Sequence, residues 1–111
     1  MSKELEQLLT RLEELSAQAV DCSDPSLHER VDTLQIQNLV RERGELIQQL
    51  PPVLAAQGPV SYVEWNRIVI IHHQGSRIHE NIERARNRLV VELSVNCSGR
   101  VFLDRMTGML G

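Results

Sequence analysis

The sequence predicts an all-α protein, an elongated antiparallel helical bundle or coiled-coil hairpin of three main helices plus a short C-terminal helix. Apolar residues recur at steps of three and four along most of the 111 residues, as they do on one face of a helix. All four prolines fall between these stretches. A hydrophobic fraction of 41% suits a single folded domain of this length. We expect helices at about residues 3–20, 25–50, 62–96 and 100–108.

The first helix is predicted by a stripe of leucines. Ser2 can cap its N-terminus, and the glutamates that follow suit the first turn. The stripe consists of Leu5, Leu8, Leu9, Leu12 and Leu15.

The second helix is expected to start with Asp24 as its N-cap and Pro25 in its first turn. Its apolar residues form two stripes that lie on nearly opposite sides of a helical wheel. Either the helix breaks near residues 34–37, or both of its faces are covered. Pro51 and Pro52 should end it, because neither can donate a backbone hydrogen bond. The stripes are Leu27, Val31 and Leu34, then Ile36, Leu39, Val40, Leu46, Ile47 and Leu50.

The third helix has the clearest signals. Ser61 and Glu64 fit a capping box at its start. A heptad seam then predicts packing against the helix that ends at Leu50, in antiparallel fashion. Gly75 on this seam allows close approach of a partner backbone, or marks a bend. The seam is Ile68, Ile71, Gly75, Ile78, Ile82, Ala85 and Leu89.

Charge and composition exclude several classes of protein. The net charge of −3, with acidic and basic residues mixed, gives no reason to expect a nucleic-acid partner. No apolar run is long enough for a membrane span, and the N-terminus lacks an apolar signal core, so we expect a cytoplasmic protein. Cys22 and Cys97 are expected to be idle thiols; a disulfide is the alternative.

No catalytic, cofactor or metal site is predicted. His79 and Glu83 are one turn apart, but two ligands do not make a metal site, and His72 lies too far away to join them. No nucleophile motif or phosphate loop is present. Arginines form a row on the third helix, and alternating charges recur on the second; both are interpreted as solvated or partner-facing stripes. These residues are Arg77, Arg84, Arg86 and Arg88, then Arg41, Glu42, Arg43 and Glu45.

The candidate binding residues are those of the C-terminal segment and the arginine row. Long helices with a spare apolar face bind other helices, and methionines suit an adaptable contact surface. We therefore predict that a partner binds Val101, Phe102 and Met106, with Arg84 and Arg88 at the rim. Whether the C-terminal segment covers the binding surface or forms it is left open.

The order and spacing of these helices resemble the FliT-type flagellar export chaperones, and more loosely the FlgN-type ones. The resemblance implies a small cytoplasmic helical chaperone that holds a secreted flagellar subunit, such as the filament cap or a hook-junction protein, before export. It also implies contact with the export ATPase complex; a homodimer is a further expectation. The residues that carry it are Arg43, Leu46, Ile47 and Leu50, then Ile68, Val69, Ile70 and Ile71, then Arg86, Val90 and Leu93.

Two other readings stay open beside the resemblance. One is a helical adaptor or coiled-coil subunit of another secretion system. The other is a small helical enzyme that uses the arginine row to grip an anionic substrate, as enzymes of the chorismate mutase type do.

Overall fold

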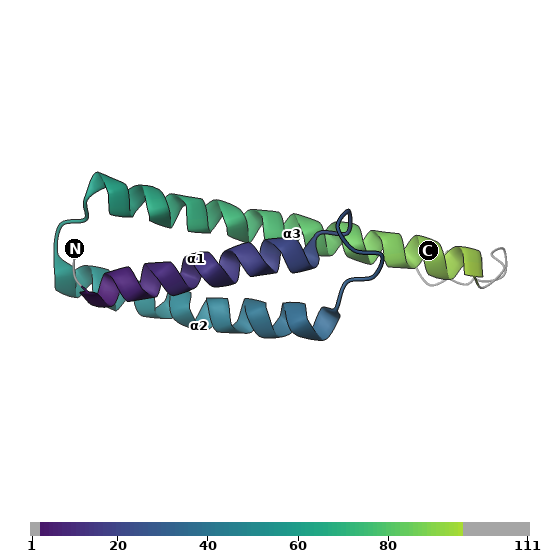
Figure 1. Ribbon diagram of the computed structural model, residues 1–111, viewed down its shortest axis with the longest axis horizontal. Coiled ribbons are helices and arrows are strands. Elements are labelled where there is room, and N and C mark those ends of the chain that lie inside the picture. Colours follow the sequence, from purple (N-terminus) through teal and green to yellow (C-terminus); the bar gives the residue numbers. More distant parts are fainter. Residues whose placement is uncertain (1–2, 97–111) are drawn as a thin grey trace, which may run out of the picture.

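The structure, a computed structural model, describes residues 3–96. It contains the helices α1 (Lys3–Ser23), α2 (Thr33–Gln57) and α3 (Tyr62–Asn96), with no strand in the described range (Figure 1). The predicted all-α class is confirmed. The molecule is elongated, with extents of 60 × 29 × 21 Å. The helix expected at 100–108 and the cap expected at Ser2 lie outside the described residues.

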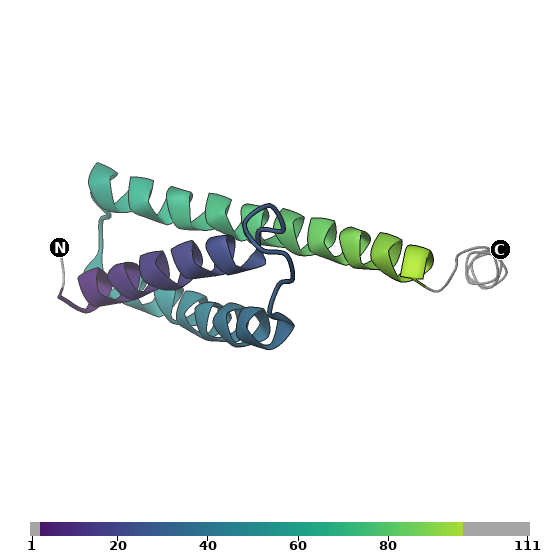
Figure 2. The same ribbon diagram turned by 45° about the vertical axis from the view of Figure 1, so that its right-hand side comes forward.

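The first helix, α1, is the centre of the bundle. It packs against both α2 and α3, whereas no Cα atom of α2 lies within 8 Å of a Cα atom of α3 (Figures 1 and 2). The apolar stripe of α1 is wide enough to contact both neighbouring helices. The helix itself ends at Ser23, three residues later than the expected end near residue 20. The buried residues of α1 are Leu5, Leu8, Leu9, Leu12, Leu15, Ser16, Ala19 and Ser23.

The prediction that α3 packs directly on α2 is therefore wrong, because α3 packs on α1. The predicted antiparallel direction of α2 and α3 is correct (Figure 1). The wide stripe of α1 lies against α3 instead. Ile71 and Ile78 of the predicted seam are buried, and Ile82 is half-buried. Leu89 is 53% exposed, because α3 continues past the ends of α1 and α2 (Figure 1).

The second helix starts later than expected, at Thr33. Its N-cap is Asp32, whose side chain accepts a hydrogen bond from the Gln35 backbone at 3.1 Å. The cap expected at Asp24 is wrong: residues 24–32 form a linker. Leu27 and Leu34 are 61% and 65% exposed. The first of the two stripes is therefore not a helix face in the core. Both alternatives are wrong, because α2 runs without a break through residues 34–37 and most of the first stripe lies in the linker before it.

The expected stop at Pro51 and Pro52 is also wrong, because α2 runs through both prolines to Gln57. Both prolines are exposed, and so are Ile47 and Gln48, the residues whose carbonyls lose a helical donor at the two prolines. The next turn is held by packing, since Val53 and Leu54 lie against the core. Gly58 ends the helix with φ of 89°, and its N–H donates to the Leu54 carbonyl at 3.2 Å.

The capping box at the start of α3 is confirmed. The Ser61 N–H donates to Glu64 Oε1 at 3.2 Å, and the Glu64 N–H donates to Ser61 Oγ at 3.2 Å. Gln57 Nε2 also donates to Glu64 Oε2 at 2.9 Å, which ties the end of α2 to the start of α3. These bonds, with Gln57 the largest contributor, hold the pKa of Glu64 below its ordinary value.

Because of this cap, the free energy of unfolding should depend on pH in the acid range. A carboxyl group with a lowered pKa contributes stability that is complete above its unfolded pKa of about 4.3 and is lost as the pH falls through the folded value. Glu64→Gln should therefore flatten the dependence of the unfolding free energy on pH below about 4.3, as measured by urea denaturation. Glu45→Gln, at an exposed position of α2, is the matched control. Equal slopes in wild type and Glu64→Gln would contradict the prediction.

Candidate helix-binding groove

A groove of about 690 Å³ opens between α2 and α3. It exists because both helices pack on α1 while their own backbones stay apart. A smaller hollow of about 160 Å³ shares Arg43, Gly75 and His79 with it and continues it along both helices. The groove is lined by Arg43, Ile47 and Leu50 of α2 and by Ile68, Ile71, His72, Gly75, Ser76, His79 and Glu80 of α3.

The groove is apolar on both walls. Ile71 is buried at its base, and Leu50 and Ile68 pack against the core from either side. Ile47 is 36% exposed, and Val40 in the smaller hollow is 40% exposed. The second apolar stripe of α2 is thus only partly covered by α1, and the uncovered part faces α3. Polar side chains stand at the α3 edge, where His72, His79 and Glu80 are exposed.

Arg43 lies among these apolar side chains and links the three helices. Its Nε donates to Ser16 Oγ of α1 at 2.8 Å, and its Nη2 donates to the Ile71 carbonyl of α3 at 2.7 Å. No carboxylate of the described residues forms an ion pair with it. Burial of the guanidinium group lowers its pKa.

Gly75 gives this guanidinium group its space. A Cβ atom at position 75 would lie 2.9 Å from Arg43 Nη2 and 3.3 Å from Nη1. The expectation that Gly75 admits a partner backbone or bends the helix is thus replaced by a different finding. The glycine faces the side chain of an arginine from the neighbouring helix.

Sequence reasoning missed Arg43 by interpreting it as part of a solvated stripe. A usable signal was present: Arg43 falls three residues after Val40 and three before Leu46, which places it on the apolar stripe of α2. A charged residue on an apolar stripe, opposite a glycine on another apolar stripe, was the pattern to look for.

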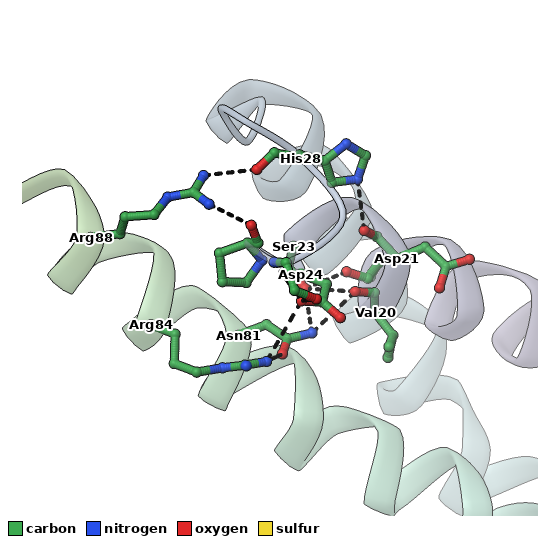
Figure 3. Close-up of polar contacts among 11 residues, drawn as sticks. Val20, Asp21, Ser23, Asp24, His28, Asn81, Arg84 and Arg88 are labelled. Carbon is green, nitrogen blue, oxygen red and sulfur yellow. Dashed lines mark hydrogen bonds and ion pairs between the residues drawn. The ribbon is translucent and has the colours of Figure 1, made fainter. Parts of the chain in front are cut away.

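The predicted rim arginines lie elsewhere, at the α1–α2 linker. Arg88 donates to the backbone carbonyl of His28 at 2.9 Å (Figure 3). It also donates to the backbone carbonyls of Pro25 and, at 2.6 Å, Glu29. Arg84 donates to Asn81 Oδ1 and forms an ion pair with Asp24 at 3.7 Å. Neither arginine lines the groove. Their part in partner binding stays a prediction.

Buried polar contacts beside the same linker join α1 to α3. Asn81 is 2% exposed, and its Nδ2 donates to the Val20 carbonyl at 3.1 Å and to Ser23 Oγ at 3.3 Å (Figure 3). The side-chain and backbone hydrogen bonds of Ser26 lower the pKa of Asp24. These contacts fix the register of α3 on α1. The other predicted site residues, Val101, Phe102 and Met106, lie outside the described residues.

The fold and the groove define the class of this protein: an all-α bundle with an open apolar groove between two of its helices. Comparison with protein-family models, curated proteins and solved structures gave no match. Within residues 3–96, no three His, Cys, Asp or Glu side chains are grouped so that they could hold a metal ion. None of the described helices is both long and apolar enough to cross a membrane.

Proposed function

We propose that this protein is a cytoplasmic flagellar export chaperone, and that its α2–α3 groove binds an amphipathic terminal segment of a secreted flagellar subunit. The filament cap is the first choice of client, and a hook-junction protein the second. The observation that carries the proposal is the open apolar groove with Ile47 and Val40 exposed on its α2 wall. The resemblance of the helix order to FliT-type chaperones supplies the identity of the client, and contact with the export ATPase complex belongs to the same proposal.

The physical argument concerns an unpaired helix. The terminal segment of an exported subunit has no partner before assembly, so its apolar stripe tends to self-associate. A groove between two helices can cover such a stripe, in the mode of a helix lying in a hydrophobic groove. Export requires release, so the affinity should be moderate, from micromolar to high nanomolar, or about −8 to −10 kcal/mol.

The alternatives differ in the support they have. A helical adaptor of another secretion system would use the same groove for a different helix, and only the partner separates it from the chaperone. The arginine-row enzyme gains no support from the geometry, because Arg88 already donates to three backbone carbonyls of its own chain. We therefore prefer helix binding to catalysis.

Calorimetry with the terminal peptide of the cap protein tests the proposal. Wild type should bind it, and Ile47→Ser should weaken binding about tenfold, because it removes apolar surface from the groove wall. Ile70→Ser is the matched control: Ile70 is 49% exposed on α3 and does not line the groove, so this variant should bind like wild type.

Absence of binding at about 100 μM to any cap, hook-junction or filament terminal segment would remove the chaperone proposal. Equal weakening by Ile47→Ser and Ile70→Ser would leave binding intact but place it outside the groove.

A further inference from the structure

We infer that Arg43 makes the groove selective for a helix that carries a carboxylate, from Asp or Glu, within its apolar face. The inference rests on the proposed function only in using the same groove as a helix-binding site; it does not depend on a flagellar client. It assigns a specificity-determining residue and the chemistry of the partner.

The first argument is the count of hydrogen-bond donors on Arg43. A guanidinium group has five N–H donors. One on Nε and one on Nη2 are used, by Ser16 Oγ and the Ile71 carbonyl. Five minus two leaves three donors, one on Nη2 and two on Nη1, without an acceptor among the described residues. They belong to a residue that lines both the groove and the smaller hollow.

The second argument is what docking would do to these donors. A helix that covers the groove displaces the water around Arg43. If the covering face were entirely apolar, the three donors and the positive charge would be buried without a partner, which is costly. A carboxylate at that position accepts two of the donors and neutralises the charge, and such charge-assisted bonds are the strong ones. The groove therefore rejects an uninterrupted apolar stripe and accepts one that contains an acid.

The third argument is that Arg43 is held in place before a partner arrives. Its bonds to α1 and α3 fix the guanidinium group, and Gly75 leaves the room that this position needs. Burial already disfavours its charged form, as the lowered pKa shows. A positioned and partly desolvated cation loses little further entropy or hydration when a carboxylate binds it.

The occupant that this chemistry selects is an acidic amphipathic helix of a partner protein. Its Asp or Glu would supply the carboxylate that Arg43 does not find among the described residues, and its apolar side chains would cover Ile47 and Val40.

The test uses the full chain and two designed peptides of about 20 residues. Both carry the same leucine stripe and differ only at its centre, where one has Glu and the other Gln. By calorimetry, the Glu peptide should bind wild type about tenfold more tightly than the Gln peptide. Arg43→Gln should bind the two peptides equally. Gly75→Ala, which displaces the guanidinium group without removing it, should reduce the preference.

Several outcomes would overturn the inference. They are equal affinity of wild type for the two peptides, an undiminished preference in Arg43→Gln, and no binding of either peptide at about 100 μM. A groove filled by a second copy would also overturn it; sedimentation would then show a dimer that the Glu peptide does not dissociate. If Arg43→Gln does not fold, the comparison of the peptides on wild type still tests the selectivity of the groove, and Gly75→Ala tests whether that selectivity depends on the position of Arg43.

The same measurements separate this inference from the proposed function. If the chain distinguishes the designed peptides but ignores every flagellar terminal peptide, the inference stands and the chaperone proposal fails. If it binds the cap peptide but treats the Glu and Gln peptides alike, the chaperone proposal stands and the inference fails.

Discussion

Leu12→Ala should lower the free energy of unfolding by about 2–5 kcal/mol. Leu12 is 0% exposed and belongs to the leucine cluster of α1, the helix that packs against both of the others. Truncation removes apolar contacts and leaves a cavity between elements that cannot easily collapse, because α1 supports both neighbours. A small domain has only about 5–15 kcal/mol of stability, so this is a large share of it. Urea denaturation followed by circular dichroism measures the change.

The matched control is Leu34→Ala in α2. Leu34 is 65% exposed, so the same chemical change should alter stability by no more than about 0.5 kcal/mol. A loss below about 1 kcal/mol for Leu12→Ala would contradict the central position of α1.

Asn81→Asp should destabilise the fold by about 1–3 kcal/mol at neutral pH. The side chain keeps its shape but loses the Nδ2 donor, so an acceptor would face the Val20 carbonyl at a site that is 2% exposed. Burial beside that carbonyl should raise the pKa of the new carboxyl more than Arg84 lowers it, because Arg84, which donates to Oδ1, is itself exposed to water. The penalty is then complete above the folded pKa and disappears as the pH falls below the unfolded value of about 3.9, where the protonated group can donate again.

Urea denaturation of variant and wild type at several pH values measures this penalty as their difference. Asn87→Asp makes the same change at an exposed position of α3 and should stay within about 0.5 kcal/mol of wild type. A penalty for Asn81→Asp that does not change with pH would contradict this prediction, because protonation removes the charge and restores the donor together.

The candidate site shows where sequence reasoning stopped. The apolar stripes of α2 and α3 were visible in the spacing, but they appeared to be covered by each other. The groove arises because α1 keeps the two backbones apart, and its position depends on the packing of three helices. Arg84 and Arg88 were singled out by their row on one helix. Arg88, however, donates to backbone carbonyls of a distant linker, and Arg84 forms an ion pair with Asp24 of the same linker, which no spacing rule reveals.

The sequence by itself determined the features that depend on near neighbours in the chain. The all-α class, the leucine face of α1, the capping box at Ser61 and Glu64 and the bounds of α3 all follow from periodicity and local hydrogen bonding, whose range is about one helical turn. Only the tertiary structure decided the course of α2 through Pro51 and Pro52, the choice of α1 as the central helix, and the meeting of Arg43 with Gly75. Each of these depends on contacts between segments far apart in sequence, where the burial of Val53 and Leu54 or the space above a glycine outweighs local preference.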